Sequence, residues 1–145
     1  MLRPRYARTF TSARYLGDNM LHFVYDALDC ASADADSVEL LNAMRETSRL
    51  LGCSVLGELP VCFQPYGVTV VLVLAESHIA VSTWPEDRLA YIDLFTCRAD
   101  VSIQCAIDPI LSVLAPGTVK FQQINRSFYG RRVSVGMSGS ALPGD

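Results

Sequence analysis

The sequence predicts an α+β fold, a two-layer α/β sandwich with helices on one face of a mainly antiparallel sheet. Two observations predict it: about six short apolar runs bounded by turn residues, typical of strands, and two segments with apolar residues at helical spacing. A chain of 145 residues is long enough for one domain and its core. We expect that domain at 16–126, between an N-terminal arm (1–15) and a Ser- and Gly-rich, flexible C-terminal tail (127–145).

The elements follow from local signals. A first strand is expected at Met20–Tyr25, followed by a loop to Asp36. Asp36 and Glu39 have the spacing of a capping box, and the apolar stripe behind them ends at Gly52, a natural helix stop. Further strands are expected at Ser54–Cys62, Val68–Ala75, Ile79–Thr83, Leu89–Thr96 and Val119–Ile124, with turns at Phe63–Gly67 and Pro85–Arg88.

A second helix is expected between Ser102 and Ala115, and Pro109 complicates it. Proline lacks the backbone N–H that a helix interior needs. Either the helix is kinked at Pro109, or its regular part begins there with Asp108 as the cap.

Composition narrows the function classes. The net charge of −3 with 12 basic residues gives no footprint for nucleic acid, and the longest apolar run is too short to span a membrane. Five cysteines without a CxxC pair predict free thiols in a reducing cytoplasm, and two separated histidines (His22, His78) predict no metal site. Half of the residues are hydrophobic, which favours an apolar surface buried in an oligomer over a merely well-filled core.

The most informative stretch runs from Val68 to Glu86. An apolar run, typical of a buried strand, leads directly into Glu76-Ser77-His78, and a second short apolar run ends at Trp84. The polar triplet therefore lies at the rim of the core, where backbone geometry is fixed. Such a place suits chemistry by a serine or by the peptide bond before it.

Four ordered blocks in this region carry a family resemblance that extends from about Leu16 to about Arg126. They are Pro65–Val68, Ala75–His78, Thr83–Glu86 and Asp93–Cys97. Together they resemble the prokaryotic S-adenosylmethionine decarboxylase family. The resemblance implies a two-layer sandwich, dimers with active sites formed between protomers, and a proenzyme that cleaves itself at a Glu–Ser bond to make a pyruvoyl cofactor.

The implied chemistry centres on Ser77. Its oxygen attacks the carbonyl of Glu76, and elimination and hydrolysis then leave residues 1–76 and a chain that begins with the pyruvoyl group. The ketone forms a Schiff base with the substrate amine, which draws electrons from the carboxylate so that carbon dioxide leaves.

Further roles come from the same resemblance. It implies that Cys97 reprotonates the product, that Glu86 binds the substrate ribose and that Phe63 stacks on adenine. Each has a plain alternative: a buried small thiol for Cys97, a solvated loop acid for Glu86 and core packing for Phe63. His78 is either part of the site or a histidine satisfied near a strand end.

The sequence departs from the family at several places. Ser82 stands where the family has a histidine that helps remove the α-proton during processing, and Thr69 replaces a serine. Val61-Cys62 replaces His-Arg, and Phe23 occupies the position of a first-strand acid. Because a serine cannot act as a base unaided, the change at Ser82 bears directly on self-cleavage.

Three interpretations remain open. The protein is an S-adenosylmethionine decarboxylase that feeds polyamine (spermidine) synthesis, with His22 or a water replacing the missing base. Alternatively, it is a pyruvoyl decarboxylase for arginine, ornithine or a specialised metabolite, or an unprocessed binding or regulatory paralogue. Retained Ser77 and Cys97 favour an enzyme, and Phe63 and Glu86 favour the nucleoside substrate.

Overall fold

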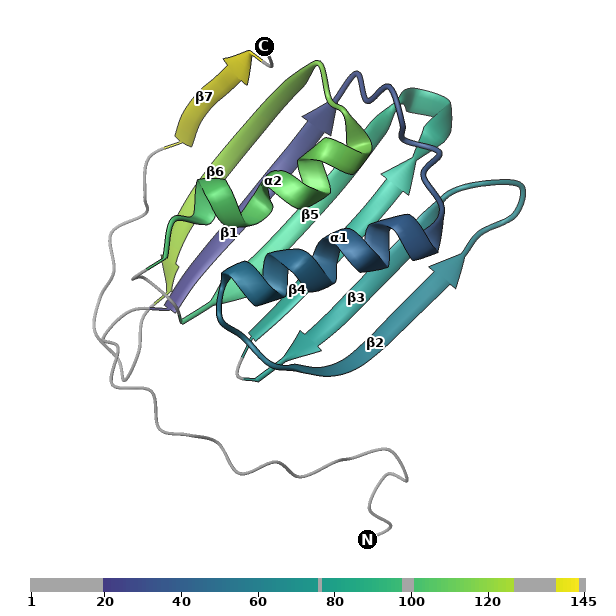
Figure 1. Ribbon diagram of the computed structural model, residues 1–145. Coiled ribbons are helices and arrows are strands. Elements are labelled where there is room, and N and C mark those ends of the chain that lie inside the picture. The colour runs from purple at the N-terminus through teal and green to yellow at the C-terminus, as the bar shows by residue number, and fades with distance from the viewer. Residues whose placement is uncertain (1–19, 76, 98–100, 127–137, 144–145) are drawn as a thin grey trace, which may run out of the picture.

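The computed structural model describes residues 20–75, 77–97 and 101–126 and the backbone of 138–143. A seven-stranded sheet forms one layer and two helices form the other (Figure 1). The predicted α+β sandwich is confirmed. The elements are β1 (Met20–Leu28), α1 (Ser37–Leu50), β2 (Val55–Cys62), β3 (Val68–Leu74), β4 (Ser77–Trp84), the 3₁₀ helix η1 (Pro85–Asp87), β5 (Leu89–Thr96), α2 (Ile103–Leu114), β6 (Thr118–Arg126) and β7 (Ser138–Pro143).

The sheet is antiparallel throughout, with the strand order β2-β3-β4-β5-β1-β6-β7. The first strand of the chain therefore lies between β5 and β6. This arrangement brings His22 of β1 into the same row across the strands as Phe95 of β5 and His78 of β4.

Helix α1 begins where its capping signal predicts. The Asp36 carboxylate accepts hydrogen bonds from the backbone N–H groups of Val38 and Glu39, and Glu39 accepts one from the N–H of Asp36. This reciprocal cap satisfies backbone donors that have no partner inside the helix. Gly52 follows the helix with φ 66°, a conformation that glycine adopts without steric cost.

Helix α2 is one helix that contains Pro109, so the alternative start at Asp108 is wrong. Its cap is Ser102, whose hydroxyl accepts from the backbone N–H of Cys105. Proline removes one internal hydrogen bond, but the helix buries Ile107 and Ile110 against the sheet. Tertiary packing thus outweighs the local cost of the proline.

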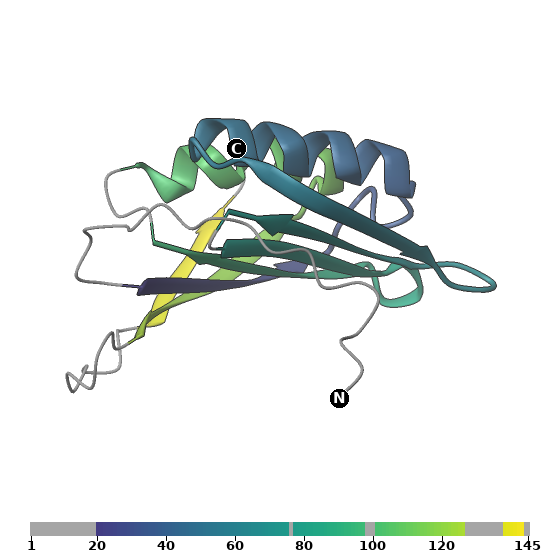
Figure 2. The same ribbon diagram turned by 90° about the horizontal axis from the view of Figure 1, so that it is seen from below.

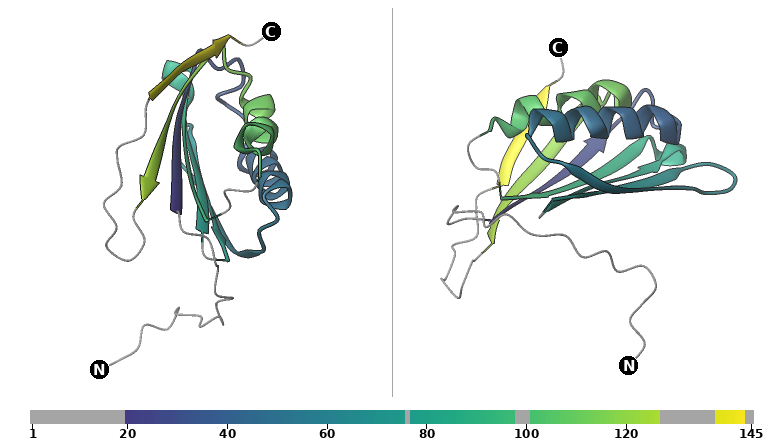
Figure 3. Two further views of the ribbon diagram at one scale, coloured as in Figure 1. Left: turned by 90° about the vertical axis from the view of Figure 1, so that its left-hand side faces the viewer. Right: turned by 60° about the horizontal axis from the view of Figure 1, so that its bottom comes forward.

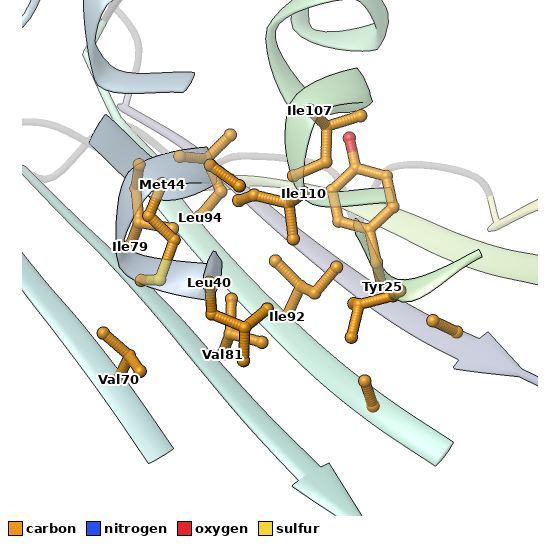
Figure 4. Close-up of a cluster of buried hydrophobic side chains, with 14 of the residues drawn as sticks. Tyr25, Leu40, Met44, Val70, Ile79, Val81, Ile92, Leu94, Ile107 and Ile110 are labelled. Carbon is orange, nitrogen blue, oxygen red and sulfur yellow. The ribbon is translucent and has the colours of Figure 1, made fainter. Parts of the chain in front are cut away.

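The two faces of the sheet differ. Figures 2 and 3 show both helices on one face, and no other described element covers the opposite face, called here the open face. On the covered face, Leu40 and Met44 of α1 and Ile107 and Ile110 of α2 pack against strand residues (Figure 4). The strand residues labelled there are Tyr25, Val70, Ile79, Val81, Ile92 and Leu94.

Two elements differ from the sequence prediction. Strand β1 continues to Leu28, into the first three residues of the segment predicted as loop (Asp26–Asp36), because it pairs on both sides with β5 and β6. Strand β7 forms in the segment expected to be a tail and pairs with β6. Neither of the two helices in the described part of the chain has the length and apolar character needed to cross a membrane.

Candidate functional site

Ser77 is the first residue of β4, and its side chain lies on the covered face with Ile79 and Val81. The residue is 9% exposed, and its Oγ is buried without a hydrogen-bond partner among the described residues. Glu76, the other half of the expected cleavage site, lies outside those residues. Buried hydroxyls normally find a partner, and among the described residues Thr47 Oγ1 on α1 is the other buried side-chain oxygen without one, so a missing partner alone does not mark a functional site.

Cys97 directly follows β5 and is buried at 7% exposure. The register of β4 and β5 pairs His78 with Phe95, two positions before Cys97. The structure therefore places Ser77 and Cys97 at the same end of neighbouring strands. A buried hydroxyl and a buried thiol thus share one end of the sheet.

Thr69 and Ser82 lie farther along the sheet. They are paired residues of β3 and β4, their side chains lie on the open face, and their hydroxyl oxygens are 2.9 Å apart. Ser82 is five residues from Ser77, or about 16 Å along an extended strand. Within one copy of the chain, Ser82 is therefore too far away to touch Ser77.

The two expected substrate-binding residues also lie at this far end. Glu86 is exposed on η1, which follows β4, and Phe63 is 51% exposed at the start of the β2–β3 turn. Phe63 donates its backbone N–H to the carbonyl of Gly67, which has φ 97° and lies close to the Thr83 carbonyl. Phe63 does not pack in the core, so that alternative is wrong.

A cavity of about 250 Å³ lies beside this turn. Phe63, Tyr66 and Pro85 line it from the β2–β3 turn and from η1, and Ala35 and Ser37 line it from the start of α1. Glu86 does not line it. The cavity is thus separate from Ser77, which is at the opposite end of β4.

The two histidines, far apart in the sequence, meet on the open face. Nε2 of His22 is 2.7 Å from Asp93 Oδ2, and Nε2 of His78 is 2.8 Å from Asp93 Oδ1. The ring of Phe95 stacks on His78 and meets His22 edge-on. Arg126 lies over Phe95 and 3.3 Å from Nδ1 of His22.

Sequence reasoning missed Asp93 and Arg126 as site residues. Asp93 is the one acid in the apolar run Leu89–Thr96, and an acid inside a predicted buried strand is a signal that could have drawn attention to it. Within the described residues, no set of three or more His, Cys, Asp or Glu side chains is arranged to hold a metal ion.

Comparison with known proteins points to one family. The family model described as S-adenosylmethionine decarboxylase matches residues 21–127. An S-adenosylmethionine decarboxylase proenzyme of Symbiobacterium thermophilum is 36% identical over 106 residues, which cover 72% of this chain and 80% of the relative. The proenzyme of Acidithiobacillus ferrooxidans is 31% identical, over 78% of this chain and 84% of its own length.

Other relatives match over a shorter part. Proenzyme 2 of Bacillus cereus is 45% identical over 64 residues, 44% of this chain and 52% of the relative, so the match spans about half of that protein. Among solved structures, the adenosylmethionine decarboxylase of Aquifex aeolicus aligns with a TM-score of 0.68 at 27% identity. That alignment covers 81% of this chain and 98% of the other.

Proposed function

This chain belongs to the S-adenosylmethionine decarboxylase family, and on that premise we propose that it is a self-cleaving proenzyme of a pyruvoyl-dependent decarboxylase. Cleavage between Glu76 and Ser77 would give residues 1–76 and a second chain that begins with the pyruvoyl group. The substrate would be S-adenosylmethionine, and the decarboxylated product would supply aminopropyl groups for polyamine synthesis. The relatives' designation as proenzymes supports the proposal.

The environment of Ser77 supports self-cleavage. Its hydroxyl is buried and makes no hydrogen bond among the described residues, so no competing partner there holds it away from the neighbouring peptide carbonyl. The pyruvoyl group made from Ser77 would supply a ketone that withdraws electrons from a bound amino acid as carbon dioxide leaves. Cys97, buried at the same end of the sheet, would then return a proton to the substrate carbon.

The separation along β4 is the observation that carries our proposal for the assembly. Ser77 and Cys97 lie at one end of the sheet. Thr69 and Ser82 lie past the middle of their strands, and Glu86 lies beyond the opposite end of β4. Ser77 and Trp84, the two ends of β4, are about 23 Å apart at the rise of an extended strand. We therefore propose that the active site is assembled from two copies of the chain.

The open face has the character that such a dimer needs. Leu59, Val73 and Trp84 lie on it and are 60%, 50% and 49% exposed. Two open faces can pack against each other about a two-fold axis that lies between the sheets, perpendicular to the strands. The strands of the second copy then run in the opposite direction to those of the first. The Ser77 end of one copy would then face the Ser82 and Glu86 end of its partner, across a gap of about 10 Å between the sheets.

The direct test is release of carbon dioxide from carboxyl-labelled substrates by purified protein. We expect release from S-adenosylmethionine and none from arginine or ornithine. The reverse result would assign the chain to a different pyruvoyl decarboxylase. Release from none of the three, by an intact chain without a ketone that borohydride can reduce, would favour a binding or regulatory paralogue.

The shared site is tested by complementation, in which two variants with different defects are co-expressed and form mixed dimers. Cys97→Ala would damage the catalytic end and Glu86→Gln the substrate-binding end. If the site spans two copies, mixed dimers contain one intact site, and co-expression gives about a quarter of wild-type activity when copies pair at random. Activity no higher than the mean of the two parent variants would contradict the shared site.

A further inference from the structure

Self-cleavage needs a group that takes the α-proton of Ser77. Ser82, where the family has a histidine, carries a hydroxyl that hydrogen-bonds to Thr69 and has no basic nitrogen. A different base must act if the chain is processed. The His22–Asp93–His78 cluster holds two imidazoles on the open face. One of them belongs to His78, the residue that directly follows Ser77 in the chain.

The partners of His22 leave it no lone pair for this role. A guanidinium only donates hydrogen bonds, so Arg126 donates to Nδ1 of His22. The ring proton of neutral His22 is then on Nε2, which donates to Asp93 Oδ2. Both ring nitrogens are engaged, and His22 acts as a support for Asp93.

His78 differs at the corresponding nitrogen. Its Nε2 donates to the other oxygen of Asp93, which leaves the lone pair of neutral His78 on Nδ1. Among the described residues, no hydrogen-bond partner meets that Nδ1, and the side chain is 43% exposed on the open face. A carboxylate that fixes one imidazole nitrogen and leaves the other free is the arrangement of a general base.

We propose that His78 is the base of self-cleavage and that Asp93, His22 and Arg126 position it. The inference rests on the proposed function. Asp93 holds the imidazole of His78, His22 occupies the second oxygen of Asp93, and Arg126 fixes both His22 and the Phe95 ring stacked on His78. The cluster replaces the histidine that the chain lacks at Ser82.

The step begins after Ser77 Oγ has attacked the Glu76 carbonyl and turned the amide into an ester with a free Ser77 amine. Nδ1 of His78 takes the proton from Ser77 Cα, and the electron pair of that C–H bond forms the Cα=Cβ double bond. The Cβ–Oγ bond breaks and Glu76 leaves as a carboxylate. The resulting enamine isomerises to an imine, and water hydrolyses it to the pyruvoyl ketone and ammonia.

The test compares the same substitution at the two imidazoles that share Asp93. His78→Gln retains an N–H donor for Asp93 but has no basic nitrogen, and His22→Gln makes the same change at the supporting position. Cleavage is followed by intact mass during folding of the full chain. Hydroxylamine, which cleaves an ester but not an amide, detects the stalled intermediate.

We expect His78→Gln to slow cleavage at least 100-fold and to accumulate the hydroxylamine-sensitive ester, as loss of a general base typically does. His22→Gln should slow it less than about tenfold, since the base itself remains. Added imidazole should partly restore cleavage in His78→Ala, a rescue that a purely structural role would not give. Asp93→Asn should slow cleavage and leave the ester detectable.

Three results would each overturn a different part of this proposal. Wild-type cleavage rates in His78→Gln would overturn the role of His78 alone and leave the proposed function standing. A stalled His22→Gln beside a normally cleaved His78→Gln would assign the base to His22. A wild-type chain that neither cleaves nor reacts with hydroxylamine would overturn this inference together with the proposed function.

Discussion

At the scale of single residues, the fold keeps a polar group where an apolar one would be more stable. The buried Ser77 hydroxyl has no hydrogen-bond partner among the described residues, and leaving such a group unsatisfied costs on the order of 1–3 kcal/mol. Cys97, buried nearby, has two explanations that its burial alone does not separate. One is catalytic and the other is packing.

Replacing Cys97 separates them. We expect Cys97→Ala to cleave itself normally but to release carbon dioxide about 100-fold more slowly, because the proton donor acts only after the pyruvoyl group has formed. Gel analysis measures the cleavage and labelled substrate measures the turnover. Unchanged turnover with a modest loss of stability would identify Cys97 as a packing residue.

Some residues of the candidate site can be predicted from the sequence and others cannot. The Glu-Ser-His triplet and Cys97 stand out because their neighbours in the chain form recognisable blocks. The contact of His22 with Asp93 joins residues 71 positions apart, and it arises only because β1 lies beside β5. No local pattern encodes that pairing, so the histidines were predicted to be isolated.

At the scale of elements, local signals located most of the structure. Strand β5 has the predicted bounds, and α1 begins at its predicted cap. Prediction was incomplete where tertiary contacts decide: β1 extends to Leu28 through pairing on both sides, and α2 continues through Pro109 because its apolar side is buried. Strand β7 depends on pairing with β6 and was not predicted.

The contact of β1 with the helix layer has a measurable consequence at Tyr25. Burial, with a smaller effect from the negative charge of Asp108 on α2, raises the pKa of Tyr25 from 10.0 to about 12. The folded state therefore holds this proton at a pH where the unfolded state has lost it. The stabilisation is complete below pH 10 and is lost as the pH rises through the folded pKa.

We expect Tyr25→Phe to reduce this alkaline sensitivity. Between pH 9 and 12 the wild-type protein should lose about 2–3 kcal/mol more free energy of unfolding than the variant, since one pKa unit corresponds to about 1.4 kcal/mol. Urea unfolding at a series of pH values measures the difference, and the retained ring keeps the packing comparable. Parallel curves for the two proteins would contradict the role of Tyr25.

At the scale of the whole molecule, the sheet separates two groups of expected site residues, which under the proposed function would act on one substrate. Both groups could be identified from the sequence, but the distance between them could not. That distance follows only from the structure, in which β4 is one unbroken strand from Ser77 to Trp84. The apolar side chains exposed on the open face, Leu59, Val73 and Trp84, supply a surface on which a second copy would bring the two groups together.

A charged side chain introduced on the open face tests the proposed dimer. We expect Val73→Glu, in the open face, to give monomers in sedimentation velocity and to abolish decarboxylation, because burying an unpaired carboxylate is costly. Val38→Glu is the matched control, since Val38 is 63% exposed on α1, on the other side of the molecule. An undisturbed dimer in Val73→Glu would place the interface elsewhere.

The most direct measurement of self-cleavage is the intact mass of freshly purified protein under denaturing conditions, with Ser77→Ala as the control. We expect two fragments in the wild type, residues 1–76 and a chain from residue 77 with a pyruvoyl terminus, and a single chain in Ser77→Ala. A wild-type chain that stays at 15.9 kDa and resists hydroxylamine would contradict self-cleavage at Ser77. Cleavage before residue 77 in Ser77→Ala would show that Ser77 is not the nucleophile.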